Sequence, residues 1–352
     1  MTEIDRSSLL SDRRDSSGSE KTIMGGSDVR AAAAGSLRQK AGGENAAAVK
    51  SDQKKAGGKS AAAGKAEQRK RRIRKRAALR AVIQLFFFIS MPGAFVAGFS
   101  GVKYVFQQVS TGSSISMNSF LAALIGLSAF TILFGRFFCG YVCAFGSMGD
   151  LMYWLSGLVQ KKVFGRKKQT SIPESVSGVL RYLKYLNLIV IVVLCAVGLY
   201  GELSGTSPWD VFSQLTSLRG VGSTYITGMF YLVLIIAGMW FKERFFCRFL
   251  CPMGAFFALL PILPISMLQR KSSQCIKGCN LCKDQCPAGI KLEPDGPKNG
   301  ECIACEKCVP VCPRGNITHT ESKLLKNEYL LILIRAALFF ALGCYLGFCR
   351  FL

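Results

Sequence analysis

The sequence predicts an α-helical membrane protein that carries a small cysteine-rich α+β domain. Half of the 352 residues are hydrophobic, and the mean hydropathy is +0.30. Several uncharged apolar runs approach the roughly 20 residues that a helix needs to cross a bilayer. Twelve of the 15 cysteines fall into four ordered groups, and the last two groups lie outside the apolar runs.

The first 76 residues have a composition of their own. Residues 1–76 are rich in Ala, Gly, Ser and Lys, so we predict a disordered basic cytoplasmic tail that cannot bury enough surface to order itself. The tail ends in a basic run from Arg69 to Arg76, directly before the first apolar segment. We interpret this run as a positive-inside anchor at the lipid surface rather than a nucleic-acid site, and we expect no nucleic-acid partner.

Five apolar segments are predicted to be transmembrane helices. They cover about residues 81–102, 119–135, 185–201, 223–241 and 329–349. Basic residues gather in 161–168 and 242–248, and basic loops stay in the cytoplasm. We therefore expect a multi-pass protein of the cell inner (cytoplasmic) membrane, with the N-terminus inside. Two further apolar stretches, 137–160 and 249–269, are expected to be re-entrant or interfacial elements.

One motif occurs twice and divides the membrane part into parallel repeats, residues 77–160 and 161–269. Arg136-Phe-Phe-Cys139 is followed by Cys143 and Gly146, and Arg244-Phe-Phe-Cys247 is followed by Cys251 and Gly254. Parallel repeats in membranes are related by an axis along the bilayer normal, so we expect the two cysteine pairs to meet at the cytoplasmic surface. Such a four-thiolate site would hold a further iron–sulfur cluster. The alternative, that these four are buried packing thiols, stays open.

The remaining eight grouped cysteines predict a ferredoxin domain over residues 270–320, followed by a C-terminal transmembrane helix in 321–352. The second run has the bacterial C-x2-C-x2-C-x3-C-P spacing, in which the fourth cysteine binds the other cluster. By this crossed rule one [4Fe–4S] cluster is held by Cys302, Cys305, Cys308 and Cys286, and another by Cys275, Cys279, Cys282 and Cys312. Two zinc sites are a weaker alternative, because zinc knuckles usually have longer spacing. The first run begins C-x3-C, which makes Cys275 the least typical ligand.

Other polar and aromatic residues receive simpler interpretations. Arg335 is expected to extend toward the lipid head groups, with a functional charge that faces the helix bundle as the alternative, and His319 is expected to lie on the surface. Asp150 is expected either to accept a proton from a quinol or to cap a helix. Aromatic residues beside the repeated motif are candidates for a quinone pocket, although interface packing explains them as well: Phe137, Phe138, Tyr141, Tyr153, Trp154, Phe245 and Phe246. The isolated Cys195, Cys344 and Cys349 are interpreted as packing residues.

Paired spans that end in R-F-F-C-x3-C-[AP]-x-G and precede a two-cluster ferredoxin resemble the NapH/NosR-type membrane polyferredoxins over residues 80–320. The family usually has proline where this chain has Ala144. The resemblance implies an electron-transfer component of a quinol dehydrogenase complex, which relays electrons between a quinone pool or a flavoprotein and a redox protein partner. We keep two alternatives: a redox-sensing or maturation protein for another metalloenzyme, and a transporter, which mid-span charges would favour.

Overall fold

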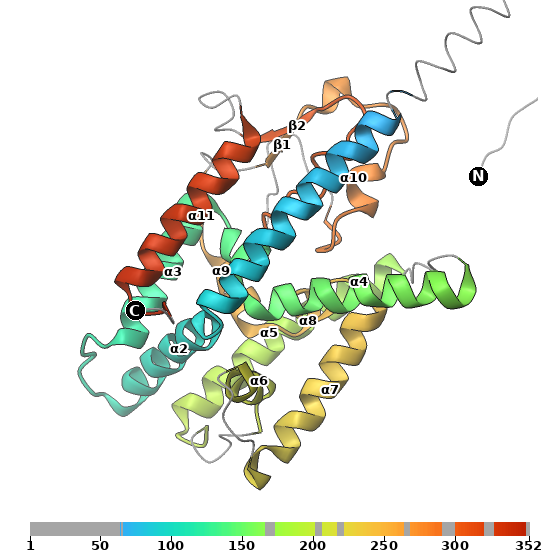
Figure 1. The fold of residues 1–352 in the computed structure, drawn as a ribbon. Helices are drawn as coiled ribbons and strands as arrows, with labels where there is room; N and C mark the ends of the chain where they lie inside the picture. Colours follow the sequence, from blue (N-terminus) through green and yellow to red (C-terminus); the bar gives the residue numbers. More distant parts are fainter. Residues whose placement is uncertain are drawn as a thin grey trace, which may run out of the picture. The chain divides into compact units, whose positions relative to one another are not determined.

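The computed structural model describes residue 64 and residues 66–165, 173–200, 206–216, 222–263, 268–290, 300–319 and 327–349. The chain divides into two units, Met1–Ala66 and Glu67–Leu352. The second unit consists mainly of helices, with one small sheet (Figure 1). Residues 1–63 of the predicted disordered tail lie outside the described residues.

The basic run before the first apolar segment is helical. One helix covers Ala66–Ser90, so residues 69–76 belong to it and not to the disordered tail in which we placed them. Lysine and arginine have high helix propensity, which favours this extension. Arg76 is fixed further by ion pairs with Glu306 and Glu328.

The first predicted span, residues 81–102, is interrupted. The helix that ends at Ser90 and helix α2 (Ala94–Thr111) are bent by 63° at the break between them. Pro92 lies at this break, and proline lacks the backbone N–H that the helix needs. The two helices therefore form either one broken span or a re-entrant element.

Within the described residues, three other helices are long and apolar enough to cross a membrane. These segments are Val176–Ala196 within α5 (Glu174–Ala196), Ser223–Phe241 in η2 (Ser223–Tyr225) and α7 (Ile226–Phe241), and Glu328–Tyr345, which is α11. The span predicted at 185–201 thus starts earlier, because the helix includes polar residues that the apolar run excluded. Helix α3 (Ser119–Phe134) is apolar but has only 16 residues.

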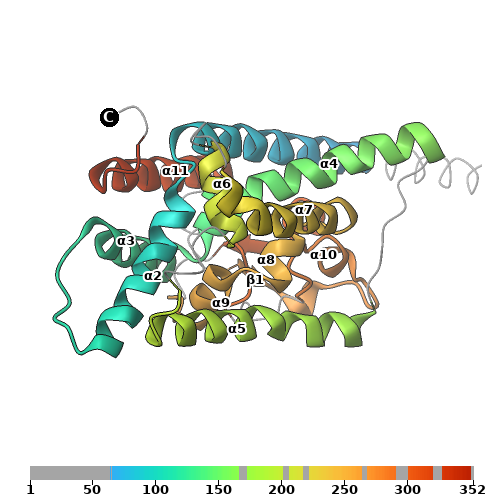
Figure 2. The same cartoon turned by 90° about the horizontal axis from the view of Figure 1, so that it is seen from below.

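The two stretches predicted to be re-entrant contain the repeated motif. The first forms a π-helix, η1 (Phe138–Val142), followed by α4 (Ala144–Phe164). The second forms the short helices α8 (Phe245–Phe249) and α9 (Pro252–Leu259). Viewed from below, α8 and α9 lie between α5 on one side and α11 with the helix Ala66–Ser90 on the other (Figure 2).

The cysteine-rich segment folds around a two-stranded antiparallel sheet. Strand β1 (Leu268–Arg270) pairs with β2 (Ile317–His319), so the two ends of the segment meet. In the chain, the 3-10 helix η4 (Ser272–Gln274) and the short helix α10 (Leu281–Asp284) follow β1 and precede β2. Leu268, Val309 and Ile317 form the small buried core, and Cys282, Cys302, Cys308 and Cys312 pack against it.

Candidate metal centres

Four of the eight predicted ferredoxin ligands line one cavity. Its wall contains Cys275, Cys279, Cys282 and Cys312, with Arg270 and Asn316 among the other lining residues. These four thiols are the set that the crossed spacing rule assigns to one cluster. The set includes Cys275, so the extra residue in its C-x3-C spacing does not remove it from the cavity wall.

The other predicted set consists of Cys286, Cys302, Cys305 and Cys308. Burial, followed by the nearby Cys286, raises the pKa of Cys302 to about 11. Burial also raises the pKa of Cys305 to about 12; Arg80 opposes this effect, and Cys286 and Cys302 add to it. For Cys308, burial and then Cys305, Cys302, Cys286 and finally Cys282 of the other set raise the pKa well above its usual value. Cys286 therefore lies electrostatically close to the three cysteines of the second run.

The backbone around Cys305 has an unusual conformation. Ala304 and Glu306 flank this cysteine with φ angles of +48° and +55°. Non-glycine residues with such angles are uncommon and concentrate at functional sites. The same loop is packed against the first membrane motif, because a Cβ on Gly140 would lie 2.5 Å from the carbonyl oxygen of Ile303.

Two predictions about charged residues near this loop are wrong. His319 is only 4% exposed, and its Nε2 lies 2.8 Å from Oε1 of Glu306. Arg335 is 1% exposed, and its Nη1 lies 4.0 Å from the same carboxylate rather than pointing toward lipid. Arg76 donates to Glu306 at 3.0 Å. Because the sequence separates these residues widely, the position of Glu306 could not be inferred from local pattern.

The four membrane cysteines lie in two motifs that contact each other in the structure. Cys139 lies on η1 and Cys143 directly follows it; Cys247 lies on α8, and Cys251 caps α9 by accepting from the backbone N–H of Gly254 at 3.2 Å. Burial raises the pKa of Cys251, and Cys247, Cys143 and Cys139 raise it further. Burial likewise raises the pKa of Cys143, with Cys247 and Cys139 as the next contributors. Each thiol pair thus interacts with the other.

The two motifs also contact each other through their arginines. A Cβ on Gly146 of the first motif would collide with the guanidinium of Arg244 from the second. A Cβ on Gly254 of the second motif would lie 3.3 Å from Nη2 of Arg136 from the first. Each glycine therefore leaves room for the arginine of the other motif, which places both guanidinium groups beside the cysteines.

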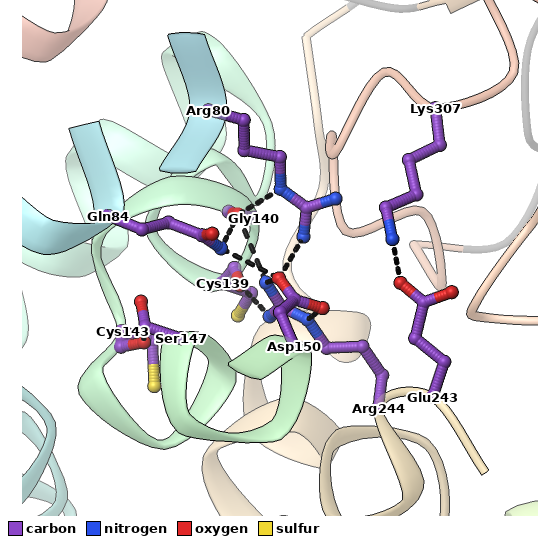
Figure 3. A network of polar contacts seen from close by, with 10 residues as sticks. All are labelled: Arg80, Gln84, Cys139, Gly140, Cys143, Ser147, Asp150, Glu243, Arg244 and Lys307. Atoms are coloured by element: carbon purple, nitrogen blue, oxygen red, sulfur yellow. Dashed lines mark hydrogen bonds and ion pairs between the residues drawn. The ribbon is translucent and has the colours of Figure 1, made fainter. Parts of the chain in front are cut away.

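Asp150 joins one of these arginines to the first helix (Figure 3). Arg80 and Arg244 both contact its Oδ2, at 2.5 and 2.7 Å, and Gln84 donates to it at 2.8 Å. Burial alone would raise the pKa of Asp150, but Arg244 and Arg80 more than offset this effect and hold it well below its usual value. Asp150 lies inside α4, so it is not a helix cap, and its low pKa argues against the predicted role as a proton acceptor.

Glu301 makes the corresponding contacts for the other arginine. Arg136 lies 3.8 Å from its carboxylate and donates to the carbonyl oxygen of Gly300 at 2.9 Å. Lys184 forms an ion pair with Glu301, and the hydroxyl of Tyr185 donates to it at 2.7 Å. Arg136 and Lys184 are both 1% exposed. Sequence reasoning missed Lys184 and Glu301, because neither belongs to a recognisable motif.

The donor sets fit a cluster better than a single ion. Among the described residues, no three His, Cys, Asp or Glu side chains converge as a single metal ion requires. A zinc site needs four ligands within about 2.3 Å of one atom, whereas the thiolates of a cubane bind four separate irons. In addition, Nε of Arg136 and Nη1 of Arg80 are buried without a hydrogen-bond partner in the described part. These N–H groups are suited to an anionic neighbour.

The aromatic residues proposed for a quinone pocket do not form one. Phe137, Phe138 and Tyr141 are buried in the core, and Trp154 is 59% exposed. A different apolar groove of about 730 Å³ lies between helices α5, α6 (Pro208–Thr216), α7 and α8. Of the proposed aromatics, only Phe245 and Phe246 line this groove; its wall also includes Val190, Leu234 and Leu250.

Two isolated cysteines form a disulfide instead of packing separately. Cys344 and Cys349 are bonded, with their Cα atoms 5.0 Å apart. Helix α11 ends at Tyr345, and Gly347 (φ +76°) turns the chain so that Cys349 reaches back to the helix. The bond therefore lies at the opposite end of α11 from Glu328, where the cysteine-rich domain is.

Comparisons with known proteins identify the class. A family described as a 4Fe-4S binding domain matches residues 118–168 and 225–264, which contain the four membrane cysteines but none of the eight ferredoxin cysteines. An uncharacterized protein of Methanocaldococcus jannaschii, MJ0750, is 33% identical over 199 residues, which is 56% of this chain and 78% of the relative. No solved structure matches significantly.

Two Escherichia coli proteins are also similar. The putative electron transport protein YccM is 28% identical over 64% of this chain and 63% of its own length. The ferredoxin-type protein NapH is 25% identical over 56% of this chain and 68% of its own length. Together with the apolar helices, these relatives indicate an iron–sulfur electron-transport protein of the membrane. The chain belongs to the family of NapH/NosR-type membrane polyferredoxins.

Proposed function

We propose that this protein relays electrons between a membrane quinone pool or a flavoprotein and a redox protein partner. The observation that carries the proposal is the single cavity lined by Cys275, Cys279, Cys282 and Cys312, the four thiols that the crossed spacing rule assigns to one cluster. In the other set, Cys286 accompanies the three cysteines of the second run. In this proposal each set holds one [4Fe–4S] cluster, and the clusters supply one-electron transfer when bound.

We propose a third iron–sulfur centre at Cys139, Cys143, Cys247 and Cys251. The mutual proximity of these thiols, the buried arginine N–H groups and the matched 4Fe-4S family segments support it. A contact between the segments supports an order of the three proposed sites. A small cavity is lined by Cys247 together with Pro287, Ala288 and Ile303, so the set with Cys286 and Cys302 is the one next to the membrane motifs.

The groove between α5, α6, α7 and α8 is the site we propose for the quinone. Its wall is mostly aliphatic and aromatic, as expected for a site that takes an isoprenoid quinone from the bilayer. Phe246 and Leu250 line it, and they are the neighbours of Cys247 and Cys251 in the chain. A bound quinone would therefore lie beside the membrane cysteines.

We propose that the cysteine-rich domain lies in the cytoplasm and that α11 carries the chain to the outside. The basic loops support this orientation through the positive-inside rule. The Cys344–Cys349 disulfide lies at the end of α11 away from that domain, and disulfides persist in oxidising compartments. The thiols expected to bind iron would then lie on the reducing side.

Iron and sulfide analysis of protein purified without oxygen tests the cofactor content. About eight irons per chain are expected from two clusters and about twelve from three. Cys308→Ser should remove about four irons per chain, and Cys143→Ser should remove about four others. Cys195→Ser is the matched control, because Cys195 lies in α5 apart from the three sets, and it should leave the iron content unchanged. A preparation without inorganic sulfide would refute the proposal.

Reduction by a quinol analogue in membranes tests the role. Val190→Trp should fill the groove and slow reduction at least tenfold. Val193→Trp, on the same helix but outside the groove wall, should leave the rate unchanged. Absence of reduction in the unaltered protein would favour the alternative role as a redox-sensing or maturation protein. Equal rates in both variants would place the quinone elsewhere.

A further inference from the structure

Two buried groups of charges surround the four membrane cysteines, and each contains two bases and one acid. The first consists of Arg80, Arg244 and Asp150, and the second of Arg136, Lys184 and Glu301. All four bases are at most 5% exposed. We call these groups the Asp150 triad and the Glu301 triad. Each has a net charge of +1, and Arg181 and Arg248 line a small cavity together with Cys247 and both motif arginines, so the side chains around the site carry an excess of positive charge.

The two triads are related by the internal repeat. Arg136 and Arg244 hold equivalent motif positions, and each reaches across to the triad of the other repeat. Arg80 and Lys184 occupy equivalent places, immediately before the first and third predicted spans. The charge pattern is therefore present twice, although the six residues come from distant parts of the chain. Duplicated retention of buried charge indicates a shared electrostatic task.

The two triads obtain their acidic residue from different parts of the chain. In the repeat, the residue equivalent to Asp150 is Ala258, which carries no charge. Gly300 packs directly on Ala258, where an added Cβ would lie 2.6 Å from its carbonyl oxygen. This close approach brings the neighbouring Glu301 to the position where repeat 2 lacks an acid. The cysteine-rich domain thus supplies the missing carboxylate one residue before Cys302.

An excess of buried positive charge requires a compensating anion. Burying an unpaired charge is costly, so proteins normally pair such groups. Four uncharged thiols would leave the excess uncompensated. Four thiolates around a [4Fe–4S] core of charge +2 carry a net charge of about −2, which has the sign needed to offset this positive charge. The buried N–H groups of Arg136 and Arg80, which have no partner in the described residues, are available to such a centre.

We propose that the two triads neutralise an iron–sulfur centre at the four membrane cysteines and set its reduction potential. Arg136 and Arg244 act as positioning residues whose fixed charge favours the reduced form, which carries one more electron. Asp150 and Glu301 limit this effect. The proposal rests on the third centre proposed above. It also makes Glu301 the residue through which the cysteine-rich domain adjusts the membrane centre.

A redox titration followed by EPR on the full-length protein in detergent tests the proposal, with dithionite as reductant. The component that Cys143→Ser abolishes is the membrane centre. Arg136→Gln removes one positive charge and should lower the reduced-to-oxidised ratio of this component about tenfold at a fixed potential, which is about 59 mV for a one-electron couple. Glu301→Gln should shift the same ratio in the opposite direction. A merely structural role predicts no such opposite signs.

Two controls separate charge from packing. Arg136→Lys keeps the charge and should restore a ratio close to that of the unaltered protein. Lys161→Gln removes an exposed charge at the end of α4 and should leave the ratio unchanged. If Arg136→Gln does not fold, Glu301→Gln alone tests the proposal, because an unchanged or lowered ratio in that variant overturns it.

The possible failures are distinguishable. If Cys143→Ser abolishes no component, the third centre is absent and the inference falls with it. If the component exists but the charge variants leave its potential unchanged, or shift it in the same direction, only the inference is overturned.

Discussion

Replacement of Asp150 by asparagine should strongly destabilise the protein. The carboxylate contacts Arg80 and Arg244 at 2.5 and 2.7 Å, and both guanidinium groups are at most 5% exposed. Removing one partner from a buried ionic group leaves uncompensated charge and typically costs 3–5 kcal/mol, about 3–5 here for Asp150→Asn. For a domain of this size about 1 kcal/mol shifts the Tm by roughly 2–4 °C, so a fall of about 6–20 °C is expected.

Thermal unfolding in detergent at neutral pH measures this change, with identical cofactor loading verified by absorbance. Asp284→Asn is the matched control, because Asp284 is exposed and should change the Tm by less than about 2 °C. Combining Asp150→Asn with Arg244→Gln should cost less than the two single changes added together, since the double variant removes both charges. A Tm for Asp150→Asn equal to that of the control would refute the reasoning.

The stability that Asp150 contributes should decrease as the pH falls. The folded-state pKa of Asp150 is lowered, so its contribution to stability is present above its unfolded pKa of about 3.9 and is lost as the pH falls below that value. The difference in free energy of unfolding between the unaltered protein and Asp150→Asn should therefore shrink as the pH falls from about 5. A difference that persists undiminished at pH 3 would contradict the assigned ion pairs.

Further predictions concern other contacts. Gly140→Ala should destabilise the protein by about 1–3 kcal/mol in denaturant unfolding, because the new Cβ would meet the backbone of the cysteine-rich loop. Gly178→Ala, which meets nothing within 4 Å inside α5, should leave stability unchanged or raise it; equal losses for both would be evidence against this packing. Cys344→Ser should free Cys349 for labelling by a membrane-impermeant thiol reagent added outside cells, with no change in iron content; labelling only from the inside would reverse the orientation.

The predictable part of the fold followed from local chemistry. Apolar runs without charge predict membrane helices because a bilayer interior offers no partner for charged groups, and Ser223–Phe241 and Glu328–Tyr345 appear in the structure close to the predicted bounds. The first predicted span is bent at Pro92, which hydropathy alone does not register because it takes no account of the missing N–H. The number of spans and the repeat architecture stay predictions, although the reciprocal glycine–arginine contacts of the two motifs favour the repeat.

The cysteine spacing by itself predicted iron–sulfur chemistry, because ligand spacing is a local property of the chain. Only the tertiary structure decided where the charges go. Asp150 and Arg335 were each assigned a role from their immediate neighbours, yet each contacts a residue well separated in the chain. Buried charges are placed by long-range pairing, since the cost of leaving one unpaired exceeds any local preference. For that reason Glu301, an ordinary glutamate in the sequence, is a central residue of the structure.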